Sequence, residues 1–193
     1  RVMRGGLAFI FFAQSAETAM SSWGFTFATT QLGQPPSVAA LFPATFYFFF
    51  TVARMLVVLA SGRPPSLFMR VGALCTLLGA VCLRAAFHLL EKRGPAAAPV
   101  GLFLGCVALI GIGTCPQFAS VLSTLRQRGA LSAQQQGQYR TASNLGNTMG
   151  MWMPGLVSLP TAEVLWAAAG VCIVTALARD FPMRSPRGDA LPA

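Results

Sequence analysis

Glu17 is the residue to which the sequence most directly assigns a chemical role, because it is an acid near the middle of the long apolar segment 5–32. A carboxylate at the centre of a membrane helix costs about 2.5–3.5 kcal/mol even on lenient insertion scales. On a helix it shares one face with Gln14, Thr18 and Ser21, which recur at helical spacing. This polar stripe predicts contact with a cavity or with other helices rather than with lipid.

Two interpretations of this stripe remain open from the sequence. In the first, Glu17 binds a proton or a cation, or accepts a hydrogen bond from a solute, with Gln14 and Trp23 beside it. In the second, a protonated Glu17 bonds to a neighbouring helix for structure alone. The first is favoured because ionisable residues inside membranes are functional by default.

A second group of polar side chains lies in later apolar segments. Gln117 follows Pro116 directly. Asn144 and Thr148 share a helical face, and Trp152 continues that line. Amides beside an aromatic ring suit an uncharged sugar or polyol. The same side chains can instead join helices, at about 1 kcal/mol or less per hydrogen bond, and both interpretations stay open.

Arg54 follows a strongly apolar run and lies near one end of the segment 37–60. It can extend to the membrane surface at little cost, or it can bond helix ends and stabilise one conformation. We therefore expect a structural or gating role for Arg54 rather than solute binding.

The composition explains why so few residues carry chemistry. Of 193 residues, 54% are hydrophobic and 10% are charged, whereas soluble domains carry about a quarter charged residues. A membrane span needs about 20 apolar residues, and six segments qualify: 5–32, 37–60, 66–89, 100–122, 141–159 and 162–178. Since backbone groups in lipid must bond internally, the sequence predicts an all-α polytopic membrane protein, a single six-helix domain over 1–193.

The basic residues predict the orientation of these spans. Ten lie on one side of the six-span arrangement: Arg1, Arg4, Arg63, Arg70, Arg126, Arg128, Arg140, Arg179, Arg184 and Arg187. Three lie on the other side: Arg84, Lys92 and Arg93. The positive-inside rule therefore places both termini in the cytoplasm, without saying which membrane is spanned.

Glycine and proline mark the expected turns and contacts. Proline pairs after Gly33 and Gly62 predict turns, and 126–140 is expected to be an aqueous link. Pro43, Pro154 and Pro116 predict kinked or interrupted helices, a feature of transporters in which unwound backbone lines a cavity. The small-residue pairs Gly101/Gly105 and Gly146/Gly150 predict close helix approach.

Several classes of function are disfavoured. The chain has five acidic residues, one His and five cysteines without a Cys-x-x-Cys pair, so we expect no catalytic residue, no metal site and no cofactor. Its Arg residues are scattered between apolar segments, which argues against nucleic-acid binding and for a lipid bilayer as the partner. The chain is therefore expected not to be an enzyme.

Five motifs occur in a recognisable order: SWGFTF at 22–27, FYFFFTVAR at 46–54, GRPP at 62–65, GIGTCPQF at 111–118 and ASNLG at 142–146. Together they resemble helices seven to twelve of a major facilitator superfamily transporter. The branch that they resemble most is the fucose-permease-like and sodium-dependent-glucose-transporter-like one. Ala53 departs from this pattern, because the relatives commonly have Gly before the arginine.

The resemblance implies one half of a major-facilitator-type bundle, with an N-terminal half of the same transporter as its partner. Because the chain does not begin with Met, we expect it to be a piece of a longer protein. By position, Glu17 and Trp23 match the acidic and aromatic region of helix seven, and Arg54 matches the arginine at the end of helix eight.

The expected function is secondary transport of a small polar solute, such as a sugar, by alternating access and with coupling to H⁺ or Na⁺ through Glu17. The alternative is a non-transporting membrane scaffold or regulatory pseudo-transporter.

Overall fold

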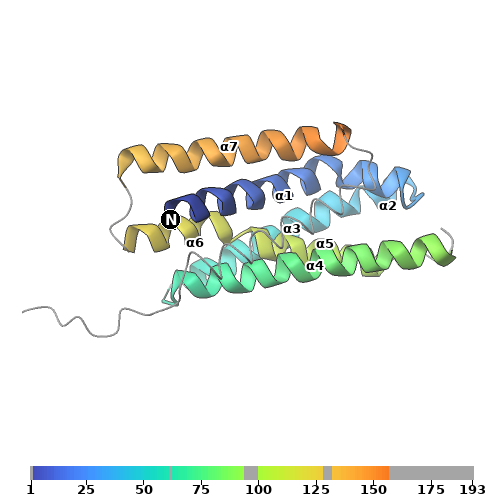
Figure 1. Cartoon of the computed structure of the whole chain (residues 1–193). Helices are drawn as coiled ribbons and strands as arrows, with labels where there is room; N and C mark the ends of the chain where they lie inside the picture. The colour runs from blue at the N-terminus through green and yellow to red at the C-terminus, as the bar shows by residue number, and fades with distance from the viewer. Residues whose placement is uncertain (1, 61, 94–99, 128–131, 157–193) are drawn as a thin grey trace, which may run out of the picture.

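A computed structural model describes residues 2–60, 62–93, 100–127 and 132–156. All the secondary structure in these ranges is helical (Figure 1). The helices are α1 (Val2–Thr30), α2 (Pro36–Ala39), α3 (Leu41–Leu59), α4 (Pro65–Arg93), α5 (Val100–Thr114), α6 (Gln117–Gln127) and α7 (Ala133–Leu156). The predicted all-α class is therefore confirmed for the described part of the chain.

Three stretches are long and apolar enough to cross a membrane: Pro36–Leu59, Pro65–Leu90 and Val100–Ser123. They correspond to the second, third and fourth predicted spans. The first and fifth predicted spans lie on α1 and α7, which are long enough but carry more polar residues and do not meet the same standard. The sixth, 162–178, lies outside the described residues.

The outward faces of these helices are apolar. Large side chains of α3 and α4 are exposed, among them Phe48, Met55, Leu56, Leu59, Val71, Leu74 and Leu78. An apolar surface of this extent is unfavourable in water and suits the hydrocarbon of a bilayer. The chain thus has the helices and the surface of a membrane-embedded protein.

Two of the predicted spans are interrupted where proline removes a backbone donor. Pro43 has no N–H for the carbonyl of Ala39, and α2 and α3 are separated at Ala40. Pro116 likewise has no donor for Ile112, and α5 and α6 are separated there. These two predicted interruptions are confirmed, whereas α7 continues without a break through Pro154 to Leu156.

The predicted link 126–140 is wrong in its second half. Helix α7 begins at Ala133 because Ser132 and Gln135 form a capping box. The Gln135 backbone N–H donates to Ser132 Oγ at 3.3 Å, and the Ser132 N–H donates to Gln135 Oε1 at 2.7 Å. The glutamine run therefore lies in the first turn of a helix and not in a loop. The helix α4 continues to Arg93, and its apolar stretch, Pro65–Leu90, agrees with the predicted span 66–89.

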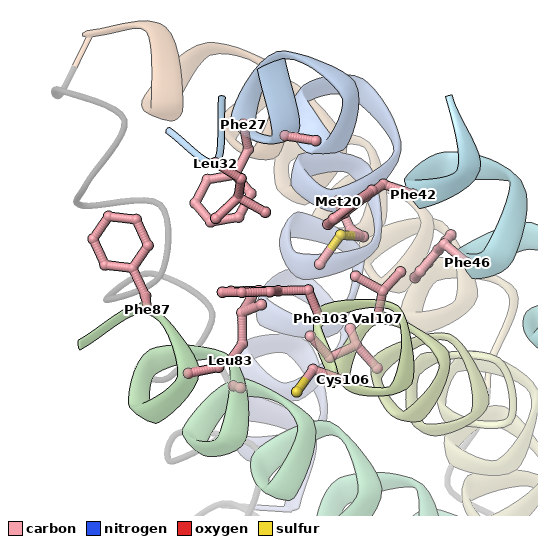
Figure 2. Packing of buried hydrophobic residues seen from close by; sticks show 14 of the residues in the cluster. Met20, Phe27, Leu32, Phe42, Phe46, Leu83, Phe87, Phe103, Cys106 and Val107 are labelled. Atoms are coloured by element: carbon pink, nitrogen blue, oxygen red, sulfur yellow. The ribbon is translucent and has the colours of Figure 1, made fainter. Parts of the chain in front are cut away.

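The helices form one elongated bundle. α7 lies along α1 on one side, α4 lies on the opposite side, and α3, α5 and α6 lie between them (Figure 1). The main core joins α1, α3, α4 and α5 through buried side chains that include Met20, Phe27, Phe42, Phe46, Leu83, Phe103 and Val107 (Figure 2). A second cluster joins α1, α4, α6 and α7 around Phe9, Met69, Val121 and Tyr139.

Glycines set the closest helix contacts. A Cβ added at Gly146 or Gly150 would collide with the backbone oxygens of Phe11 and Ser15, so α7 lies directly against α1. The close helix approach predicted for this pair is confirmed, and its partner is α1. A Cβ at Gly111 would lie 2.6 Å from the carbonyl oxygen of Phe46.

The other predicted glycine pair makes no such contact. An added Cβ at Gly101 or Gly105 would meet no atom of the described residues within 4 Å. The predicted close approach there is not found in the described part of the chain.

Gly33 ends the turn after α1 with φ +60°, a conformation that costs an L-residue about 1 kcal/mol or more. Gly33→Ala is therefore expected to destabilise the protein by about 1 kcal/mol, which corresponds to roughly 2–4 °C in Tm. Gly62→Ala is the matched control, since Gly62 has equal open space but no positive φ. A thermal melt in detergent measures both, and equal shifts would contradict the assignment of the cost to φ.

Candidate functional site

A cavity of about 310 Å³ lies between α1, α3, the α5–α6 junction and α7. Its polar lining comes from Gln14, Glu17, Arg54, Thr114, Cys115 and Ser143, and its apolar lining includes Ile10, Phe50, Val57 and Phe118. This volume is at the lower end of the range for sites that bind small molecules. An apolar wall with a few convergent polar groups is also typical of such sites.

Glu17 is half-buried and held on the α1 wall of the cavity. Gln14 Nε2 donates to Glu17 Oε2 at 2.7 Å, and Ser143 Oγ donates to Gln14 Oε1 at 3.3 Å. This relay runs from α7 through Gln14 to the carboxylate. The polar stripe predicted on the first segment therefore faces a cavity and another helix.

Arg54 lines the same cavity from α3. Glu17 lies 13 residues before the end of α1, and Arg54 lies 13 residues after the start of α3. At a rise of 1.5 Å per residue, each is about 20 Å from the connection between the two helices. The connection between the two helices contains α2, so this counting alone does not bring the two charges together; the cavity lining, which includes both side chains, does.

The interrupted helix reaches the cavity directly. Thr114, Cys115 and Pro116, the residues at the end of α5 and in the break before α6, are all part of its lining. Thr114 Oγ1 donates back to the Ile110 carbonyl at 3.0 Å, which satisfies one of the last carbonyls of α5. Irregular backbone at membrane depth is thus buried in protein beside a cavity, as the physics of the bilayer requires.

On α7, Ser143 lines the cavity and Asn147 lies one turn further along, in contact with α1; the sequence analysis did not include either among the site residues. Asn147 Oδ1 accepts a hydrogen bond from Thr18 Oγ1 at 2.7 Å, and Ser143 reaches Gln14. Ser143, Gly146, Asn147 and Gly150 recur at helical spacing, so this small and polar face was the signal that could have identified them.

Gln117 does not line the cavity. Its side chain is fully buried, and its Nε2 donates to Thr76 Oγ1 of α4 at 3.2 Å. Its Oε1 has no hydrogen-bond partner among the described residues. The structure thus places Gln117 in a contact between α4 and α6.

The remaining predicted site residues also lie apart from the cavity. Trp23 Nε1 donates to the Met151 carbonyl at 2.8 Å and so joins α1 to α7. Asn144 and Trp152 are exposed on α7, Trp152 with 63% of its surface accessible. Of the predicted residues, the structure brings together Glu17, Gln14 and Arg54.

Within the described residues, no group of three or more His, Cys, Asp and Glu side chains is placed to hold a metal ion.

The bond between Thr18 and Asn147 predicts energetic coupling between α1 and α7. A double-mutant cycle with Thr18→Val and Asn147→Ala is expected to give about 0.6 kcal/mol, and at most about 1.7 kcal/mol, from unfolding measured in detergent or bicelles. Thr29→Val serves as the control partner, since Thr29 Oγ1 bonds only to carbonyls of its own helix. Equal coupling in both cycles would show that the hydrogen bond does not join the helices.

Comparison of the chain with protein-family models, with curated proteins and with solved structures gives no match.

Proposed function

We propose that this chain is the C-terminal six-helix half of a secondary transporter that carries a small polar solute across a membrane by alternating access. The observation that carries the proposal is the cavity in which Glu17, Arg54 and the interrupted α5–α6 segment meet. Transporters commonly bind solute and coupling ion near an interrupted helix inside the membrane, and an intramembrane acid is a usual coupling group. The motif order that resembles a major facilitator superfamily transporter supports the same function.

The proposal includes six spans with both termini in the cytoplasm, an N-terminal half that completes the solute pathway, and coupling to H⁺ or Na⁺ at Glu17. The bundle supports this orientation, because the start of α4, the end of α6 and the start of α7, where several arginines occur in the sequence, lie at the end of the bundle at which α1 begins (Figure 1). A sugar is the solute that the polar side chains of Gln14, Thr114 and Ser143 and the apolar wall suit best.

The test is uptake by the full-length gene product reconstituted in liposomes. Labelled sugars, polyols and sugar acids are offered with an imposed pH gradient, with an imposed Na⁺ gradient and with neither. We expect accumulation of at least one solute above its external concentration in one of the gradient arms. No uptake and no exchange of any solute would favour the alternative, a membrane scaffold or regulatory pseudo-transporter.

A further inference from the structure

Arg54 and Glu17 are the two charged side chains in the lining of the cavity, and their surroundings differ. Glu17 already has a partner, since Gln14 Nε2 donates to its carboxylate at 2.7 Å. Within the described ranges, the Arg54 guanidinium makes no hydrogen bond or ion pair, although it is near enough to Glu17 for electrostatic attraction. The cavity therefore contains an acceptor that is occupied and a strong donor that is not.

An unengaged guanidinium beside an apolar wall favours one class of ligand. It has five N–H donors in a planar fork that matches a carboxylate in two parallel hydrogen bonds. An ionised acceptor also neutralises its charge, which a hydroxyl group does not. Phe50 and Val57 line the cavity near Arg54 on α3, and the Arg54 side chain itself is exposed, so its guanidinium is accessible to a solute.

The position of Glu17 then links the anion to a proton. An ionised Glu17 in the same cavity repels a bound carboxylate, whereas a protonated one does not and can still accept the bond from Gln14. The other titratable groups that face Glu17 in the lining are Arg54 from α3 and Cys115 from the α5–α6 junction; α7 contributes Ser143, which does not titrate. Binding of an anion and binding of a proton at Glu17 therefore favour one another.

We propose that the solute carries a carboxylate, that Arg54 binds it, and that a proton enters with it on Glu17. This rests on the proposed transport function and narrows its solute to organic acids such as sugar acids. The cavity then holds the Arg54 cation, the solute anion and a neutral Glu17, so that solute and proton move together without net charge.

The test compares D-glucuronate with D-glucose, which differ in a carboxylate in place of a CH₂OH group. The full-length protein is assayed for binding by thermal shift in detergent and for uptake in liposomes. We expect binding of glucuronate, weakened at least tenfold in Arg54→Gln and also weakened in Arg54→Lys, which lacks the planar fork. Arg63→Gln makes the same charge change in an exposed turn outside the cavity and is expected to leave binding unchanged.

The proton link is tested with the same ligand. Glucuronate stays ionised at any pH well above the ordinary pKa of a carboxyl group. A fall in affinity with rising pH therefore reports a group of the protein, and we expect this fall in the wild-type protein as Glu17 ionises. In Glu17→Gln this pH dependence is expected to disappear while binding persists. A pH dependence that is unchanged in Glu17→Gln would overturn the link.

Three further results would overturn the inference. If D-glucose is taken up and glucuronate is not, the transport function stands and the anion assignment fails. If neither D-glucose nor glucuronate binds while another neutral solute is taken up, the transport function again stands and the anion assignment again fails. If phosphatidylglycerol stabilises the protein through Arg54 and glucuronate does not, the guanidinium binds a lipid phosphate instead.

Discussion

Glu17→Gln is expected to abolish gradient-driven accumulation of solute and to leave solute exchange intact. One proton that moves with each solute without net charge allows about tenfold accumulation per pH unit, because one unit corresponds to about 1.4 kcal/mol. In the variant this ratio is expected to fall to one. Gln at position 17 can still accept the hydrogen bond from Gln14, so the wall of the cavity is preserved.

The measurement is uptake by the full-length protein in liposomes with an imposed pH gradient, with a Na⁺ gradient as the second arm. Glu17→Asp is the matched control, since it keeps a titratable carboxylate at the same place, and it is expected to retain accumulation. If Glu17→Gln accumulates solute as strongly as the wild-type protein, Glu17 is not the coupling group.

Gly150→Leu is expected to have the largest effect on folding. An added Cβ at Gly150 would already collide with the Ser15 carbonyl oxygen and lie 3.1 Å from the Ala19 nitrogen. Both are backbone atoms of α1, which cannot move aside as a side chain can, so α7 must separate from α1. Overpacking commonly costs about 1–3 kcal/mol, and a rigid backbone neighbour places this site at about 3 kcal/mol or more.

Gly105→Leu is the matched control, because an added Cβ at Gly105 would meet no described atom within 4 Å. Folded yield and Tm in detergent measure the two variants side by side. We expect Gly150→Leu to lower Tm by about 10 °C or more or to prevent folding, and Gly105→Leu to stay close to the wild-type protein. Equal Tm values would mean that α1 and α7 do not pack as described.

The helical class and the interrupted segments could be predicted because they depend on local chemistry. Pro116 removes a backbone donor wherever the helix lies, and a carboxylate at position 17 conflicts with lipid in any arrangement. The start of α7 was missed for an equally local reason. The polar run after Arg126 was interpreted as a loop, although Ser132 and Gln135 have the spacing of a capping box.

The composition of the site could be predicted only in part, because it depends on which helix faces meet. Nothing local distinguishes Gly101 and Gly105, which make no close contact in the described part of the chain, from Gly146 and Gly150, which lie against α1. In the same way, the sequence left two roles open for Arg54, extension to the membrane surface or a bond at helix ends. Its position in the cavity follows from the antiparallel packing of α1 and α3, which no single helix encodes.

The central claim is that the cavity between α1, α3, α5–α6 and α7 binds the transported solute, and Cys115 tests it most directly. Cys115 lines the cavity and is partly exposed, whereas Cys106 is buried between helices. The measurement is the rate at which a membrane-impermeant thiol reagent modifies Cys115 in the full-length protein, with and without D-glucuronate or D-glucose. We predict that modification blocks uptake and that the transported solute slows it at least severalfold. Modification that proceeds at the same rate with solute bound, or that leaves uptake unchanged, would contradict the account.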